Sequence, residues 1–282
     1  EEIDAIVLSG GSAFGLDAAG GAMERLAALG RGFAIRPTPR DQRSRGNPID
    51  ARVPIVPAAI LFDLGFPGRR PWRGEPPYRD LGRRAVDAAG KDFALGNAGA
   101  GLGAKSGALK GGIGSASLVL SGGATVGALV AVNSWGSAVR PDCGRFWAAD
   151  LALSGEIAAQ PPPPEAPFDL EDLSGGAPAV PGANTTLAVV ATDAALDKGG
   201  CRRLAIMAQD GLARALRPVH TPFDGDMVFA LATGDGAPET PAILARLGMA
   251  VADCLARAVM RALMAAETLG GIPGWRARWG GG

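Results

Sequence analysis

The stretch GANTTLAVVATDAALDK, residues 182–198, places an Asn-Thr-Thr triplet where a Gly- and Pro-rich segment ends and an apolar run begins. The run at 187–192 predicts a strand. Two hydroxyl residues after an Asn can simply form the turn that leads into a strand. They can also mark a bond where the chain cuts itself before Thr185 and exposes a hydroxyl nucleophile at a new N-terminus.

Strands and helices are both predicted around this triplet, so the fold class is α+β. Pro54 and Pro57 interrupt one apolar run, which favours an irregular or edge strand at 53–64. Thr240 followed by Pro241 marks the start of the last helix. The other apolar patterns predict strands at 6–8, 32–37, 115–120, 124–132, 187–192 and 227–234, and helices at 16–29, 78–90, 197–217 and 240–269.

Two segments are predicted to lack regular structure. Residues 159–184 contain four consecutive prolines and several acids, which favours an extended linker. Residues 96–117 are rich in glycine and predict a long loop. Gly99, Gly101 and Ala104 match a loose dinucleotide fingerprint, but a poor strand precedes them and a poor helix start follows. The loop is therefore better explained by close backbone approach to a ligand or by tight packing of two sheets.

The composition excludes several classes of protein. The chain of 282 residues carries 28 basic and 28 acidic side chains, so neither nucleic acid nor a membrane surface is an expected partner. No apolar run is long enough to predict a membrane span. The three widely spaced cysteines suit a reducing compartment, the cytoplasm. His220 is the only histidine, so no multi-histidine metal site is possible, and we expect neither metal nor cofactor. We interpret His220 as structural.

Six blocks of sequence occur in an order typical of one family: LSGGSAFGLDAAGG, GNAGAGLGA, LKGGIGSAS, VAVNSWG, GANTTLAVVATDA and FDGDMVFALAT. The chain resembles the L-aminopeptidase/D-amino-acid esterase family over residues 3–269. Relatives include β-peptidyl aminopeptidases, the nylon-oligomer endo-hydrolase and a pantetheine hydrolase. The resemblance implies an αββα sandwich of the N-terminal-nucleophile type. It also implies further residues before the first block, so the N-terminus is expected to be incomplete.

The resemblance implies that a single domain, 1–282, cleaves itself between Asn184 and Thr185. The products would be an α chain, 1–184, and a β chain, 185–282, and such αβ units would assemble as a homotetramer. Thr185 would then be the nucleophile of the mature protein. Its own α-amino group, with an ordinary pKa of about 7.7–8.0, can accept the hydroxyl proton, so no catalytic histidine is required.

Four further residues match catalytic positions of the family. Asn133 would donate its amide to the oxyanion. Lys110 would hold the threonine amine neutral and orient the hydroxyl, with Lys105 as a competitor for this role. Asp224 and Asp226 would position the amine and hydroxyl and balance the lysine charge. Each also has a plain structural interpretation, since Asp-Gly-Asp is a common turn sequence and a lysine beside glycines can be a solvated loop charge.

Substrate contacts are harder to assign from the sequence. Ser9, Gly10 and Gly11 form a tight strand–helix turn that we expect near the site, and Phe62 replaces a tyrosine expected in some relatives. Asp17 is a candidate for binding a substrate ammonium group. No residue selects among a short peptide, a nylon-type amide and a pantetheine-type amide.

The sequence therefore predicts a self-processing hydrolase of small amide, peptide or ester substrates, acting through an acyl-enzyme ester on Thr185. A nylon-oligomer or pantetheine-type amide hydrolase is an alternative. An ornithine-type acyltransferase on the same scaffold is another, and a non-enzymatic binding domain that never cleaves is a third.

Overall fold

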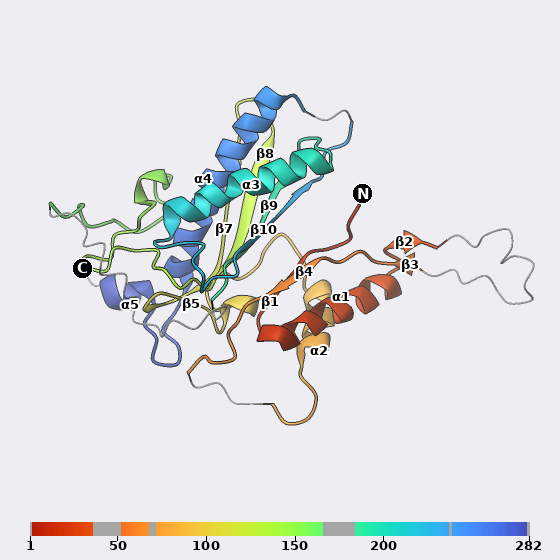
Figure 1. Cartoon of the computed structure of the whole chain (residues 1–282), viewed down its shortest axis with the longest axis horizontal. Coiled ribbons are helices and arrows are strands. Elements are labelled where there is room, and N and C mark those ends of the chain that lie inside the picture. Colours follow the sequence, from red (N-terminus) through yellow and green to blue (C-terminus); the bar gives the residue numbers. More distant parts are fainter. Residues whose placement is uncertain (1, 36–51, 68–71, 166–183, 237–238, 281–282) are drawn as a thin grey trace, which may run out of the picture.

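The computed structural model describes residues 2–35, 52–67, 72–165, 184–236 and 239–280. Its largest sheet has four strands in the order β10-β9-β8-β7 (Figure 1). β9 and β10 are parallel, and the other two pairs are antiparallel. The strands are β7 (Gly112–Val119), β8 (Thr125–Val132), β9 (Leu187–Thr192) and β10 (Met227–Ala232).

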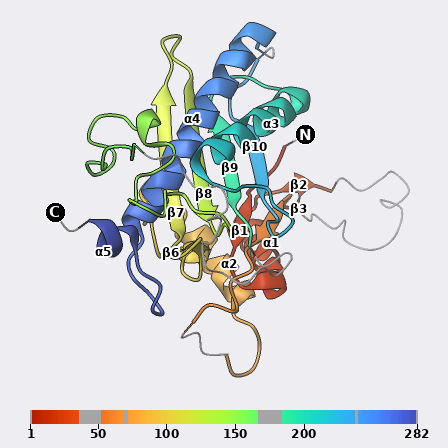
Figure 2. The same ribbon diagram turned by 60° about the vertical axis from the view of Figure 1, so that its left-hand side comes forward.

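Two helices cover one face of this sheet, α3 (Lys198–Ala215) and α4 (Pro241–Ala265), as Figure 2 shows. Alternate residues of β8, among them Val126 and Val130, point into the apolar core that the sheet forms with these helices. Thr240 caps α4 by accepting a hydrogen bond from the Ile243 N–H at 3.4 Å, as the Thr-Pro pair predicts.

A smaller layer covers the opposite face of the large sheet. β1 (Val7–Ser9) and β4 (Ala58–Ile60) pair in parallel, and α1 (Asp17–Ala28) and α2 (Tyr78–Asp87) pack beside them. A second apolar cluster joins the sheets, with Ala59 and Leu61 on one side and Ala131 and Leu187 on the other. The layer order is helix, sheet, sheet, helix, which confirms the α+β class and the αββα sandwich.

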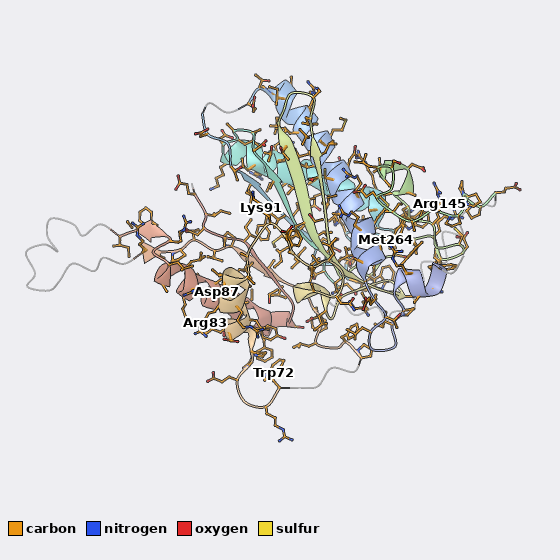
Figure 3. All side chains as sticks on the ribbon, turned by 180° about the vertical axis from the view of Figure 1, so that it is seen from behind. Trp72, Arg83, Asp87, Lys91, Arg145 and Met264 are labelled. Carbon is orange, nitrogen blue, oxygen red and sulfur yellow. The ribbon has the colours of Figure 1, made fainter. Side chains whose placement is uncertain are left out.

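Figure 3 shows the two helical layers from behind. The labelled Arg83 and Asp87 lie on the α1–α2 side, whereas the labelled Met264 lies at the end of α4. The remaining short elements are β2 (Phe33–Ala34), β3 (Arg52–Val53), β5 (Lys105–Ser106), β6 (Leu109–Lys110), α5 (Trp275–Trp279) and the 3₁₀ turns η1 (Ser12–Leu16), η3 (Gly99–Gly101) and η4 (Ala149–Leu151). Among the described residues, no helix has the length and apolarity needed to cross a membrane.

The structure corrects the predicted glycine loop at 96–117. Strand β7 already begins at Gly112, and the short strands β5 and β6 precede it. Glycine is required inside β7, because a Cβ on Gly114 would lie 1.9 Å from the carbonyl oxygen of Ala258 in α4. The strand therefore approaches the helix backbone closely. The glycines that this packing requires are also typical of loops, which explains the wrong prediction.

Other expectations can also be compared with the structure. The run 53–64 is irregular, as its two prolines predict: Val53 ends β3, and only Ala58–Ile60 form a further strand. The last helix ends at Ala265 rather than at 269. Gly99–Gly101 form a 3₁₀ turn, with no strand directly before it and no α-helix directly after it, so the context of a dinucleotide fingerprint is missing, as predicted. Most of the predicted linker, 166–183, lies outside the described residues.

Candidate active site

The peptide bond between Asn184 and Thr185 lies just before β9, between the end of β8 and the turn before β10. The Thr185 N–H donates to the main-chain carbonyl of Asn133 at 2.7 Å. The Asn184 carbonyl accepts the Gly225 N–H at 2.9 Å, and the Asn184 N–H donates to the Phe223 carbonyl at 3.2 Å. Neighbouring segments thus hold both hydrogen-bonding groups of this peptide, its carbonyl oxygen and its N–H.

The Thr185 side chain is directed at the bond it would cleave. The residue is 7% exposed, and its hydroxyl donates to the Asn184 carbonyl oxygen at 2.6 Å. Gly225 leaves the space that the hydroxyl occupies, since a Cβ there would lie 3.0 Å from Thr185 Oγ1. The next residue, Thr186, is fully buried, and its hydroxyl has no hydrogen-bond partner in the described part of the chain.

Asn133, at the end of β8, joins three segments. Its Nδ2 donates to the Phe62 carbonyl at 3.2 Å, and its Oδ1 accepts the Lys105 N–H at 3.1 Å. Its main-chain carbonyl is the group that holds Thr185. In this uncut chain the hydrogen-bond donors to the Asn184 carbonyl are Gly225 and Thr185, which the sequence did not predict, while the Asn133 amide is engaged with Phe62.

Lys110 is fully buried in β6 and holds the glycine-rich segment. Its Nζ donates to the carbonyls of Gly101, Ala104 and Gly111 at 2.6, 2.8 and 2.8 Å. Burial lowers the pKa of Lys110 to about 8, although the negative charge of Asp63 acts in the opposite direction. Lys110 therefore shapes the wall of the site through main-chain groups.

Asp63 is a buried acid that the sequence analysis missed. Its Oδ1 accepts the Gly11 N–H at 2.6 Å. A Cβ on either Gly10 or Gly103 would lie 2.6 Å from its Oδ2, so glycine is needed on both sides of the carboxylate. The available signal was a single acid within the apolar segment AILFDLG. Asp63 fixes the Gly10–Gly11 turn, beside which the Ser9 hydroxyl donates to the Gly10 carbonyl at 2.9 Å.

Asp224 fastens the turn that carries Gly225. Its Oδ1 accepts the Trp135 N–H at 2.9 Å, and its Oδ2 accepts the Thr221 hydroxyl at 2.5 Å. Asp224 also pairs with Asn184 in a parallel β-bridge. The carboxylate thus ties the turn to the segment that follows Asn133.

Asp226 lies on the other side of Gly225, and its side chain is 2% exposed. Its Oδ1 accepts the Thr186 N–H at 2.7 Å, and its Oδ2 is 2.8 Å from His220 Nδ1. Burial raises the pKa of Asp226, and the Asp224 charge adds to this rise, whereas the Thr186 N–H and His220 oppose it. Asp226 therefore contacts the backbone of Thr186, the residue that follows Thr185.

Two candidate substrate contacts have different surroundings. Phe62 is 45% exposed, beside the carbonyl that accepts the Asn133 amide, so its ring is available at the surface of the site. Asp17, proposed as an ammonium-binding acid, instead pairs with Arg79 at 2.7 Å on the outer helices. Among the described residues, no group of three His, Cys, Asp or Glu side chains is placed to hold a metal ion.

Comparisons with known proteins identify the family of the chain. The profile of the family described as peptidase family S58 matches residues 2–277. An uncharacterized aminopeptidase of Mycobacterium tuberculosis is 46% identical over 289 residues, which cover 97% of this chain and 78% of the relative. A 6-aminohexanoate-oligomer endohydrolase of Paenarthrobacter ureafaciens is 26% identical over 248 residues, which cover 84% of this chain and 62% of the relative.

The solved L-aminopeptidase D-Ala-esterase/amidase of Ochrobactrum anthropi, described as a variant of the Ntn hydrolase fold, superposes with a TM-score of 0.55 at 22% identity. The superposition covers 89% of this chain and 64% of that structure, and it supports the fold assignment. The chain is therefore a hydrolase of peptide or amide bonds that belongs to peptidase family S58.

Proposed function

We propose that the chain is a self-processing, aminopeptidase-like hydrolase that uses Thr185 first to cut its own backbone and then to cleave substrates. The observation that carries this proposal is the hydrogen bond of 2.6 Å between the Thr185 hydroxyl and the Asn184 carbonyl oxygen. The peptide group between them is held at both its carbonyl and its N–H. Such alignment of a nucleophile with its target contributes strongly to rate.

Self-cleavage begins when Thr185 Oγ1 attacks the carbonyl carbon of Asn184. The new C–O bond replaces the C–N bond, and the hydroxyl proton passes to the departing nitrogen of Thr185. Water then hydrolyses the ester, which leaves a carboxylate on Asn184 and a free α-amine on Thr185. The Gly225 N–H, 2.9 Å from the carbonyl oxygen, stabilises the oxyanion during the attack.

The same groups serve the mature protein. The α-amine formed at Thr185 remains within reach of the Asn133 main-chain carbonyl, which holds the corresponding N–H before cleavage. This amine accepts the hydroxyl proton when Thr185 attacks a substrate carbonyl. Once the Asn184 segment has left, the donors for the substrate oxyanion are the Gly225 N–H and the second N–H of the Asn133 amide, whose first N–H binds the Phe62 carbonyl. Lys110 and Asp224 keep the surrounding segments in place.

We propose short peptides and peptide-like amides or esters as substrates. The 46% identical relative is named an aminopeptidase, which favours substrates with a free amino group. The exposed Phe62 ring and the Trp135–Phe223 ring pair, whose centroids are 5.1 Å apart, offer apolar surface next to the residues that hold the scissile peptide.

Linear 6-aminohexanoate oligomers are a second candidate because of the named endohydrolase relative. A pantetheine-type amide remains an alternative. The peptidase family match and both named relatives give no support to an ornithine-type acyltransferase.

We also propose an oligomeric state and a cellular compartment for the protein. The family resemblance favours a homotetramer of cleaved αβ units, which light scattering after size-exclusion chromatography would test. The cytoplasm suits the cysteines, because Cys143, Cys201 and Cys254 are all free.

Thr185→Ala tests the proposed nucleophile. This variant should remain a single chain and should not hydrolyse amino-acid p-nitroanilides, β-peptides or aminohexanoate oligomers, because the attacking oxygen is gone. Thr185→Ser should retain self-cleavage and activity. Thr186→Val is the matched control: it removes a neighbouring buried hydroxyl that has no partner in the described structure, and should still be cut before residue 185. Full turnover by Thr185→Ala would contradict the proposal.

A further inference from the structure

His220 occupies an unusual place in the turn before β10. It is one of two non-glycine residues with positive φ in the described structure, at 53°. Its main-chain N–H lies 3.3 Å from Asp226 Oδ2, and its ring Nδ1 lies 2.8 Å from the same oxygen. Left-handed backbone is costly for a residue with a side chain, so this conformation needs stabilising contacts. The two contacts with Asp226 supply them.

A continuous path connects the His220 ring to the nucleophile. The oxygen of Asp226 that His220 does not contact accepts the Thr186 N–H at 2.7 Å, and Thr186 follows Thr185 directly. Asp226 also follows Gly225, whose N–H holds the Asn184 carbonyl. A movement of the Asp226 carboxylate would therefore disturb the backbone on both sides of the scissile bond.

The charges around Asp226 are few. The carboxylate is 2% exposed, so burial opposes its ionisation, and the Asp224 carboxylate opposes it further. His220 is the basic side chain that acts on Asp226, and it is 38% exposed to solvent. The Thr186 N–H and the His220 main-chain N–H are further stabilising contacts. His220 thus favours the ionised carboxylate.

We propose that His220 is a positioning residue, which keeps the Asp226 carboxylate ionised and aligned and thereby holds Thr186 and Gly225 in place for self-cleavage and turnover. This inference rests on the proposed function. Loss of the ring should let Asp226 take up a proton at higher pH. The acidic limb of the pH–rate profile should then move upward, because protonated Asp226 no longer holds the Thr186 N–H as firmly.

His220→Gly and His220→Asn form a matched pair. Both residues tolerate positive φ, but only asparagine retains a side-chain N–H that can reach Asp226. We would measure self-cleavage by intact mass, and kcat/KM for an amino-acid p-nitroanilide from the foot of the acidic limb up to about pH 9, beyond the ordinary pKa of the Thr185 amine. His220→Gly should shift the acidic limb upward by about one pH unit and lower kcat/KM severalfold at pH values on that limb. His220→Asn should lie between His220→Gly and the wild type.

A wild-type acidic limb in His220→Gly would overturn the inference, as would equal shifts in the Gly and Asn variants. If His220→Gly does not fold, His220→Asp replaces it, because Asp also tolerates positive φ and its charge repels Asp226. This variant should then show a larger upward shift than His220→Asn, and equal profiles would refute the inference. An uncut, inactive wild-type chain would instead contradict the proposed function, so the two failures are distinguishable.

Discussion

The two helical layers of the sandwich are stabilised in different ways. On the main-sheet side, α4 is buried along most of its length, and side chains such as Leu255 and Val259 are fully inaccessible. On the other side, α1 and α2 are held by a close approach of their backbones at Gly82. Surface ion pairs of Arg79 with Asp17 and Glu24 also join them. The helices of one layer thus pack into an extended apolar core, whereas α1 and α2 are held by a close backbone contact at Gly82 and by exposed ion pairs.

This difference corresponds to a division of roles around the proposed cleavage site between Asn184 and Thr185. Thr185, Asn133 and Gly225 lie at the ends of the main-sheet strands, where the apolar core fixes the backbone. The smaller layer contributes Phe62 and Asp63, which follow β4 and close the site from the opposite side. Thr185 and the groups that hold it thus belong to the layer with the extended apolar core, whereas the smaller layer shapes the site. We therefore expect changes within α1 and α2 to affect self-cleavage less than changes at Gly225.

The largest effect should come from Gly225→Ala, on the main-sheet side. The added Cβ would lie 3.0 Å from Thr185 Oγ1, so the hydroxyl would have to shift by a few tenths of an ångström relative to the Asn184 carbonyl. We expect self-cleavage to slow by about one to two orders of magnitude, followed by intact mass over time. Gly127→Ala in β8 is the control, because its nearest atom would be 3.8 Å away. Unchanged cleavage in Gly225→Ala would show that the hydroxyl position does not limit the reaction.

Lys110→Met tests the support of the glycine-rich segment. At about pH 7, where the ammonium group carries three N–H donors, loss of the three hydrogen bonds to main-chain carbonyls should lower the free energy of unfolding by about 2 kcal/mol, measured by urea denaturation. The exposed Lys91→Met is the control and should have little effect. A Lys110 variant as stable as the wild type would mean that the glycine-rich segment needs no such support.

The difference in unfolding free energy between the wild type and Lys110→Met should depend on pH, and the pKa of Lys110 gives the sign of this dependence. The folded chain releases the Lys110 proton with a pKa of about 8, whereas the unfolded chain holds it up to about 10.5. Between these values the unfolded state binds more protons, so stability relative to Lys110→Met should rise with pH. We expect a gain of about 2 kcal/mol between about pH 7.5 and 9.5. A flat or falling difference would contradict the lowered pKa.

The sequence predicted the main-sheet side better than the site itself. Strands β8 and β9 were predicted to within one residue, because apolar and β-branched residues dominate them. Strand β7 was partly mistaken for a loop, because Gly112 and Gly114 serve close packing against neighbouring backbone. The spacing of apolar residues along the sequence indicates which side chains are buried, but it does not indicate where two backbones pack closely at glycine.

The hydrogen bonds of the site were the least predictable part. The family resemblance predicts Thr185 as the nucleophile, but the Gly225 N–H that holds the Asn184 carbonyl belongs to the backbone and has no side-chain signal. Asp63 and Gly11 are 52 residues apart, and their contact depends on the pairing of β1 with β4. The Asp226 bond to the Thr186 backbone spans 40 residues and depends on the register of β9 and β10. Such contacts require the fold to be known first.

Gly82→Ala tests the close backbone contact in the smaller layer. A Cβ there would lie 2.0 Å from the Ala18 carbonyl oxygen, so α1 and α2 would have to separate. We expect the free energy of unfolding to fall by about 1–3 kcal/mol, which would be seen as a lower Tm, while self-cleavage is retained. Gly90→Ala, with no atom closer than 4.0 Å, should leave Tm nearly unchanged. Abolished cleavage in a folded Gly82→Ala protein would contradict the division of roles.

The smallest effect should come from Glu24→Gln. Glu24 accepts hydrogen bonds from Arg79 and Arg83, which lower the pKa of Glu24, but all three side chains are more than 40% exposed. Solvent and salt weaken such pairs, so we expect a small fall in Tm that about 0.5 M NaCl removes. Self-cleavage should not change. A large fall in Tm at low salt would show that the ion pairs, rather than the glycine contact, hold this layer.

The identity of the cleaved bond tests the central claim most directly. Purified wild-type protein should separate under denaturing conditions into two fragments, and N-terminal sequencing of the smaller one should begin at Thr185 with the residues TTLAVV. An unbroken chain with full hydrolytic activity, or a small fragment that starts at another residue, would contradict the role of the Thr185 hydroxyl and its own amine.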